Sequence, residues 1–137
     1  MGTLAQQHQI HGVQPVLPVP DVAAAADWFV RVLGFEIDFL HGEAPYPHGR
    51  VKTGSMGDAG WGAPVYIHLA RDIGLIRPCG ETRLHVGHDI DTLHAHVQAQ
   101  GAQVLQPPTD QAWGLREMRL QAPGGHRLVL GAEITLD

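Results

Sequence analysis

Hydrophobic positions in the first half of the chain predict the order strand, helix, strand, strand, strand. Residues 22–33 carry apolar side chains at helical spacing, between a potential N-cap, Asp21, and a potential C-cap, Gly34. Residues 35–40 alternate apolar and charged side chains, which is typical of a strand with one buried face, here that of Phe35, Ile37 and Phe39. The other strands of this half are expected at 13–19, 50–53 and 65–70.

The second half of the chain repeats this order. Asp89 is expected to cap a helix over 90–100 that ends at Gly101, and strands are expected at 83–86, 103–105, 115–121 and 127–131. A βαβββ unit cannot cover its own sheet, so the two units must pack together. The predicted fold is α+β, with two βαβββ modules that form an open, barrel-like mixed sheet with the helices outside. The expected boundaries are a loose leader at 1–11, module 1 at 12–73, a linker at 74–80 and module 2 at 81–137.

Composition and charge narrow the class of protein. The chain is 44% hydrophobic and 17% charged, which fits a folded protein with a real core. Its formal net charge of −5 disfavours nucleic acid and anionic membrane surfaces as partners. We expect a cytoplasmic protein, because no apolar stretch approaches the roughly 20 residues that span a bilayer, residues 1–11 do not read as a signal peptide, and a single cysteine, Cys79, cannot form an internal disulfide.

Several motifs resemble the glyoxalase, bleomycin-resistance and dioxygenase superfamily, also called the vicinal oxygen chelate superfamily. They are, in chain order, Val19–Val22, Val32–Phe35, Gly101–Ala102, Trp113–Glu117 and Ala122–Leu128. The segment Trp113–Glu117 is most similar to the bleomycin-resistance branch, while Ala122 and Gly124 replace the usual aspartates of the closing turn. The resemblance implies the two-module fold, a homodimer and a cavity for a small molecule.

Metal-dependent members of this superfamily chelate one divalent ion with four side chains. Carried over by position, the first two places fall on Gln14 and His68, the third on Thr82, or on Arg83 if the alignment slips by one residue, and the fourth on Val129. A hydroxyl group or an arginine cation in the third place and an isopropyl group in the fourth cannot hold a divalent ion. The resemblance therefore implies a site without a metal cofactor, with one divalent ion as the alternative.

The expected function is metal-independent binding of an aromatic or amphipathic compound, such as an antibiotic, in a dimer cleft. The pocket should be mostly apolar with a few oriented polar groups, and the expected ligand-binding residues are Gln14, Val16, Trp61, Tyr66, His68, Thr82, Leu84, Trp113 and Val129. Trp61 is expected on a flap, Trp113 is expected to follow a loop with Pro107 and Pro108, and Arg116 and Glu117 are expected to form an exposed ion pair of little value for stability.

Two enzymatic alternatives stay open at this point. A metal-dependent lyase, isomerase or dioxygenase would recruit His68 with His85 or another nearby histidine. Acid–base catalysis without a metal would use His68 with Tyr66.

Overall fold

A computed structural model describes residues 13–54, 64–72, 81–87 and 89–134. The expected leader, the linker with Cys79, and the flap with Trp61 lie outside these residues. The first module contains β1 (Val16–Val19), α2 (Val22–Leu33), β2 (Glu36–His41), β3 (His48–Lys52) and β4 (Tyr66–Arg71). The second contains β5 (Glu81–His85), α3 (Ile90–Ala99), β6 (Gln103–Asp110), β7 (Leu115–Gln121), a short 3-10 turn η1 (Pro123–Gly125) and β8 (Arg127–Glu133).

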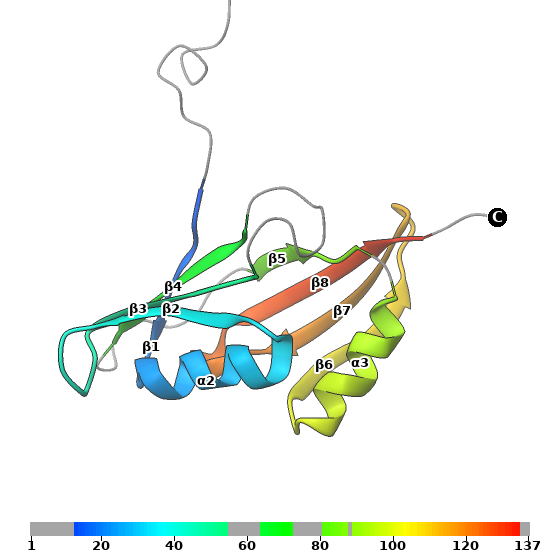
Figure 1. The fold of residues 1–137 in the computed structure, drawn as a ribbon. Helices are drawn as coiled ribbons and strands as arrows, with labels where there is room; N and C mark the ends of the chain where they lie inside the picture. The colour runs from blue at the N-terminus through cyan, green and yellow to red at the C-terminus, as the bar shows by residue number, and fades with distance from the viewer. Residues whose placement is uncertain (1–12, 55–63, 73–80, 88, 135–137) are drawn as a thin grey trace, which may run out of the picture.

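Each module folds into its own four-stranded mixed sheet, and the two sheets have the same topology. The strand orders are β1-β4-β3-β2 and β5-β8-β7-β6, with the first pair of each sheet parallel and the other pairs antiparallel. Figure 1 shows both helices on the same side of the two sheets. The predicted α+β fold with two βαβββ modules is confirmed, but the strands form two open sheets rather than one barrel-like sheet.

Helix α2 has the predicted ends. The Asp21 carboxylate accepts a hydrogen bond from the backbone N–H of Ala24 at 3.0 Å, and Gly34 adopts the left-handed conformation with φ of 72°. This capping satisfies backbone groups that the helix itself leaves unpaired. The buried residues of α2 pack against β2, β3 and β4, and they are Val22, Ala25, Ala26, Phe29 and Val32.

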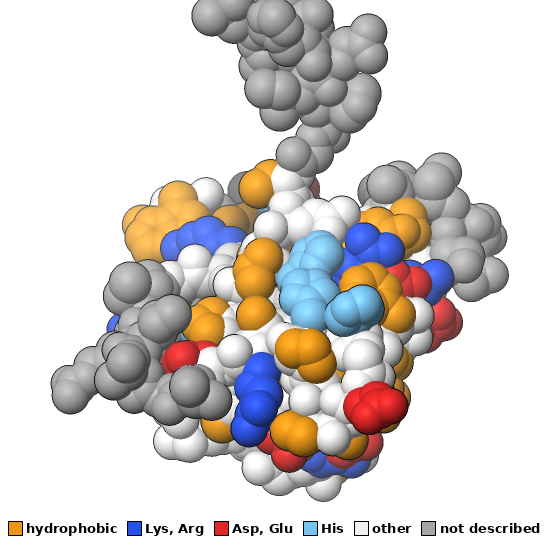
Figure 2. Space-filling view, turned by 90° about the vertical axis from the view of Figure 1, so that its left-hand side faces the viewer, with side chains coloured by type: hydrophobic (Ala, Val, Ile, Leu, Met, Phe, Trp, Pro, Cys, Tyr) orange, Lys and Arg blue, Asp and Glu red, His pale blue; other side chains and the backbone are white. Residues whose placement is uncertain are grey.

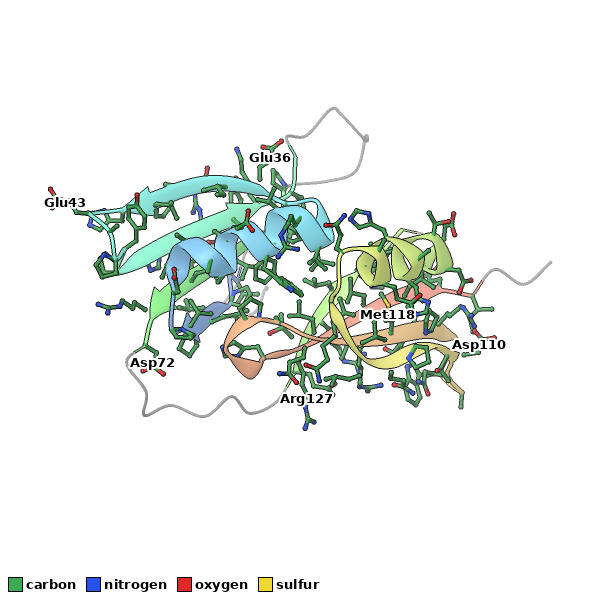
Figure 3. The ribbon with its side chains drawn as sticks, turned by 90° about the horizontal axis from the view of Figure 1, so that it is seen from below. Glu36, Glu43, Asp72, Asp110, Met118 and Arg127 are labelled. Carbon is green, nitrogen blue, oxygen red and sulfur yellow. The ribbon has the colours of Figure 1, made fainter. Side chains whose placement is uncertain are left out.

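Helix α3 covers the second sheet in the same way. Ile90 and Val97 are the buried residues of α3, and Met118, Leu120 and Leu128 supply buried side chains from the sheet. In Figure 3, which views the molecule from the helix side, Met118 lies beside α3. No helix in the described ranges is long and apolar enough to cross a membrane.

Two strand predictions need correction, both at β-bulges. The register between β2 and β3 shifts between Ile37 and Phe39, and these side chains are exposed rather than buried with Phe35. Strand β6 does not end at residue 105 but continues to Asp110, through Pro107 and Pro108. A second register shift falls at these prolines, on the edge strand of the sheet, where a residue without an N–H is tolerated.

Hydrogen bonds join the two modules. The His126 ring donates through Nε2 to the backbone carbonyl of Pro18 in β1 at 2.6 Å. His96 of α3 donates to the carbonyl of Arg31 near the end of α2 at 3.1 Å, and the Arg31 guanidinium donates to the Gln100 carbonyl at 3.4 Å. The relative placement of the modules therefore depends on both the helices and the closing turn.

Candidate functional site

Each sheet has one face that packs on its helix and one that does not, which we call the helix-free face. In the first sheet, the residues buried toward α2 include Leu17, Val51, Ile67 and Leu69. Side chains alternate between the faces of a strand. The helix-free face of the first sheet therefore carries Val16, His48, Arg50, Tyr66 and His68, and the register pairs of His68 with Val16 and Arg50 agree with this.

A chain of hydrogen bonds runs across this face. His68 Nε2 lies 2.5 Å from the side-chain oxygen of Gln14, and His68 Nδ1 lies 2.9 Å from His48 Nε2. Because the Gln14 oxygen only accepts, His68 donates through Nε2. In its neutral form His68 then accepts at Nδ1, so His48 donates to it through Nε2. Gln14 thus orients both imidazole rings.

Burial lowers the pKa of His68 from its ordinary value, and the neighbouring His48 and Arg50 lower it further, while Asp38 acts in the opposite direction. Arg50 forms an ion pair with Asp38, at 2.5 Å between Arg50 Nη2 and a carboxylate oxygen. The helix-free face of the first sheet therefore favours a neutral His68.

Planar side chains surround the two histidines. The ring of Phe39 stacks on that of His48, with centroids 5.9 Å apart and an interplanar angle of 29°. The guanidinium carbon of Arg50 lies 4.4 Å from the ring centroid of Tyr66 and 5.2 Å from that of Phe39. Figure 2 shows histidine side chains gathered on one face of the molecule with hydrophobic side chains around them. Planar groups of this kind suit stacking on an aromatic ligand.

In the second sheet, the predicted residues divide between the two faces. Arg83 pairs in register with Val129, whereas Thr82 pairs with Leu128, which is buried in the core. Thr82 and Leu84 therefore lie on the face that packs toward α3, and Arg83 and Val129 share the helix-free face. Of the two alternatives for the third metal place, Arg83 is therefore the one that shares a face with Val129, the residue at the fourth place.

Glu117 is completely buried, so the prediction of an exposed Arg116–Glu117 ion pair is wrong. Its Oε2 accepts a hydrogen bond from Arg83 Nη1 at 2.5 Å, across from β5. Arg116 instead pairs with Asp91 and Asp110, at 2.9 Å in each case, and these hydrogen bonds raise the pKa of its guanidinium. Arg116 and Glu117 are consecutive residues of β7, so their side chains point to opposite faces of the sheet and cannot pair with each other.

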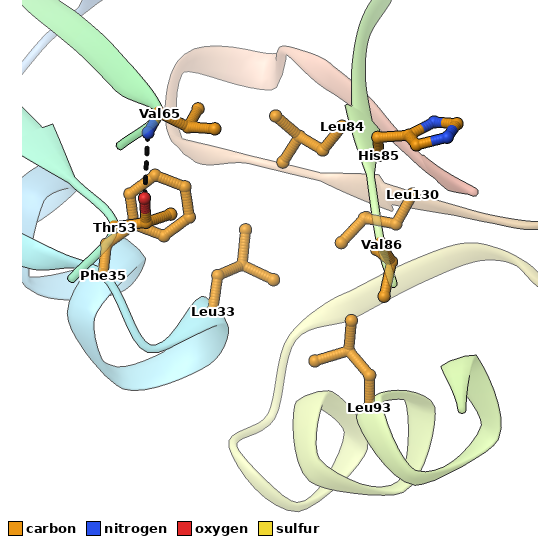
Figure 4. Close-up of a pocket in the computed structure, with 9 residues that line it drawn as sticks. All are labelled: Leu33, Phe35, Thr53, Val65, Leu84, His85, Val86, Leu93 and Leu130. Carbon is orange, nitrogen blue, oxygen red and sulfur yellow. Dashed lines mark hydrogen bonds between the residues drawn. The ribbon is translucent and has the colours of Figure 1, made fainter. Parts of the chain in front are cut away.

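Two cavities adjoin the second sheet. A cavity of about 230 Å³ lies between the modules on the helix side (Figure 4). At its edge the Thr53 hydroxyl accepts a hydrogen bond from the backbone N–H of Val65. Its lining residues are Leu33, Phe35, Thr53, Val65, Leu84, His85, Val86, Leu93 and Leu130. Leu84 thus lines a cavity, although not the one on the helix-free face. A second cavity of about 440 Å³ is lined, among described residues, by His85, Val86, Gly87 and Glu133.

The side chains at the four positions where the superfamily resemblance places metal ligands do not fit a divalent ion. Gln14 and His68 are suitable ligands, but they form a hydrogen bond with each other. The carboxylate of Asp38, in the same sheet, is already paired with Arg50. Arg83 brings a cation to the third place, and the fourth holds the aliphatic Val129, which is 1% exposed. In the described part of the chain, no three His, Cys, Asp or Glu side chains lie close enough to hold a metal ion.

Some residues of these two helix-free faces were not predicted from the sequence. Phe39, His48, Arg50 and Glu117 were not among the predicted site residues. His48 falls in a segment with two prolines that predicts a loop, although it begins β3. Trp113, which was predicted, lies in the turn between β6 and β7 and is 60% exposed, free of the packing role that a buried tryptophan would have.

The geometry defines a class of protein: paired βαβββ modules whose helix-free faces carry the polar groups. Residues 83–130 match the family model of the Glyoxalase/Bleomycin resistance protein/Dioxygenase superfamily. This match confirms the resemblance to the superfamily for the motifs of the second module, Gly101–Ala102, Trp113–Glu117 and Ala122–Leu128, which all lie within the matched residues. The matched range begins at Arg83.

Solved structures extend this likeness to the fold of both modules. A glyoxalase-related enzyme from Clostridium phytofermentans matches with a TM-score of 0.71 and 23% identity, over 90% of this chain and 95% of its own. The bleomycin-binding protein from Streptomyces verticillus, solved with copper(II)-bleomycin, matches with a TM-score of 0.67 and 24% identity, over 90% and 97%. TioX from Micromonospora sp. ML1 matches with a TM-score of 0.65 and 23% identity, over 90% and 100%. No curated protein sequence matches the chain.

Proposed function

We propose that this protein binds an aromatic or amphipathic organic compound, such as an antibiotic, without a metal ion. The observation that carries the proposal is the set of planar side chains on the helix-free face of the first sheet, where Phe39, Arg50 and Tyr66 flank two hydrogen-bonded histidines. Such a face offers stacking area and a few oriented polar groups, the usual makeup of a small-molecule site. The likeness to a bleomycin-binding protein supports this reading.

A homodimer is part of the proposal. Apolar side chains on the helix-free face of the first sheet are exposed, among them Val16 at 54% and Phe39 at 37%. A second copy of the chain would cover this face and close a cleft over it. Light scattering coupled to size-exclusion chromatography should give the mass of a dimer, and a monomer at all concentrations would contradict this part of the proposal.

A thermal-shift screen tests the binding function. Bleomycin and other aromatic antibiotics are added with and without a chelator, and a ligand at a hundred times its Kd should add about 2.7 kcal/mol of stability. We expect a shift of several degrees that the chelator leaves unchanged. Elemental analysis of dialysed protein is the counter-test: near-stoichiometric zinc, nickel, iron or manganese would favour the metal-dependent alternative.

A matched pair of variants locates the ligand. Phe39→Ala removes a ring that stacks on His48, whereas Ile37→Ala truncates a similarly exposed side chain of the same strand. We expect Phe39→Ala to weaken binding of the hit compound about tenfold, equivalent to about 1.4 kcal/mol, and Ile37→Ala to leave it unchanged. Equal effects of the two variants would place the ligand elsewhere.

A further inference from the structure

The helix-free face of the second sheet contains a buried carboxylate that is only half satisfied. Glu117 is 0% exposed, and its Oε2 is bonded by Arg83, but no described residue donates a hydrogen bond to its Oε1. A buried acceptor without a partner costs free energy, so the few that occur call for an explanation. A ligand that supplies the missing donor is one such explanation.

The residues opposite Glu117 connect it to a cavity. Glu117 pairs in register with Gly131 of β8, which has no side chain, and a Cβ atom added there would lie 3.5 Å from Glu117 Cγ and 3.6 Å from its Oε2. Two pairs further along these strands, on the same face of the sheet, Leu115 pairs with Glu133, and Glu133 lines the cavity of about 440 Å³. His85, the β5 partner of Gly131, lines the same cavity. The register partner of Glu117, Gly131, thus lies between two residues that line this cavity, His85 on the next strand and Glu133 two positions along β8.

Arg83 contributes the second half of the recognition pattern. Its side chain is 55% exposed, although Nη1 holds the buried Glu117. A guanidinium group has five N–H donors, and Glu117 accepts one of them in the described part of the chain. The carboxylate with the unpaired Oε1 is thus bonded to a guanidinium that has further donors and a half-exposed side chain.

Charge decides which chemical group fits. The pair is neutral as a whole, so an organic cation would place two positive charges around one carboxylate, and an anion would place two negative charges around one guanidinium. A neutral group with a donor and an acceptor side by side meets both needs without this repulsion. A carboxamide or lactam edge has this pattern, with its N–H for Glu117 Oε1 and its carbonyl for Arg83.

We propose that Glu117 and Arg83 form a subsite that binds the carboxamide or lactam edge of an aromatic ligand. This inference rests on the proposed binding function and names a chemical group that its ligand should carry. It assigns Glu117 a role in recognition in addition to its structural ion pair.

Benzamide and acetophenone are suitable probes, because they share the ring and the carbonyl while a methyl group replaces the amide nitrogen. Titrations followed in ¹H–¹⁵N NMR spectra give both affinities and locate the contact through the amide signal of Gly131. Wild-type protein should bind benzamide about tenfold more tightly, since each 1.4 kcal/mol is a factor of ten. A ratio within twofold would overturn the proposal.

Glu117→Gln provides a sharper test at nearly constant shape. Arg83 requires an oxygen, so the new amide should turn its nitrogen to the place of Oε1, where it donates instead of accepting. The preference for benzamide should then fall to within twofold or reverse toward acetophenone. Glu36→Gln, which removes an exposed carboxylate from β2, is the matched control and should keep the wild-type ratio. An unchanged ratio in Glu117→Gln would refute the subsite.

Arg83→Met covers the case in which Glu117→Gln does not fold. This substitution leaves a buried carboxylate without its partner and lowers stability, but that carboxylate should prefer a cation, so benzamidine should raise the Tm of the variant and overtake benzamide in affinity. The same data separate the two proposals. Equal binding of both neutral probes on the helix-free faces would reject the subsite alone, whereas no binding up to the solubility limit would reject the subsite and aromatic capture together.

Discussion

The contact between His126 and Pro18 offers the most direct test of how the modules are joined. His126→Ala removes the hydrogen bond that the ring donates to the Pro18 carbonyl, which spans 108 residues of sequence. The lost bond should cost about 1 kcal/mol, and an acceptor left without a partner adds to this, for a total of about 1–2 kcal/mol. For a chain of this size we expect a Tm lower by about 4–8 °C.

Two further variants separate the hydrogen bond from packing. His126→Phe keeps a ring in this 8% exposed position and should lose nearly as much stability as His126→Ala if the bond dominates. Gly124→Ala should disrupt the same contact from the turn, because the new Cβ would lie 2.9 Å from the Pro18 carbonyl oxygen. The φ of +83° at this position is also unfavourable for alanine. Urea unfolding gives each free energy, with His85→Ala, at an exposed position, as the control. A loss below about 0.5 kcal/mol in His126→Ala, the range of ordinary surface substitutions, would refute the reasoning.

Three other predictions concern individual residues. Because the folded state lowers the pKa of His68, the unfolded chain binds this proton more readily as the pH falls below 6.5; the stability it contributes is present above that value and is lost as the pH falls through the folded pKa. The fall in Tm between about pH 7.5 and 5 should therefore be shallower in His68→Gln than in the wild type, and identical slopes would contradict the shift. Gly49→Ala should cost about 1–3 kcal/mol in urea unfolding, since its Cβ would lie 2.9 Å from a methyl group of Val22. Arg116→Ala breaks an exposed charge network and should cost less than about 1 kcal/mol at low salt, and still less at high salt.

The helices could be predicted from sequence because their signals are local. Asp21 and Gly34 lie next to the ends that they cap, and the apolar spacing between them has one interpretation. Strand ends were less predictable, since they depend on partners elsewhere in the chain. Strand β6 runs past two prolines because its bulged, unpaired edge tolerates them, which no pattern within residues 103–110 indicates.

The site was harder to predict for the same reason. The partner of Glu117 lies 34 residues away, on a strand that is not adjacent to β7 in the sheet, so its neighbour Arg116 was the natural but wrong choice. Phe39 was expected in the core because it alternates with Ile37. The bulge between these two residues, which reorders the strand, is a property of the β2–β3 pairing.

The position of Arg83 has the largest consequence for function. A shift of one residue moves every side chain of a strand to the opposite face. With Thr82 in the third metal place, that place would hold a weak neutral ligand, and a metal site would need a nearby histidine to complete it. With Arg83 at that place, its side chain brings a cation that is paired with a buried carboxylate at 2.5 Å and that would repel a divalent ion. Removing Glu117 would leave that cation in place, and removing Arg83 would leave the fourth place with the aliphatic Val129, which has no donor atoms, so neither change alone produces a chelating set.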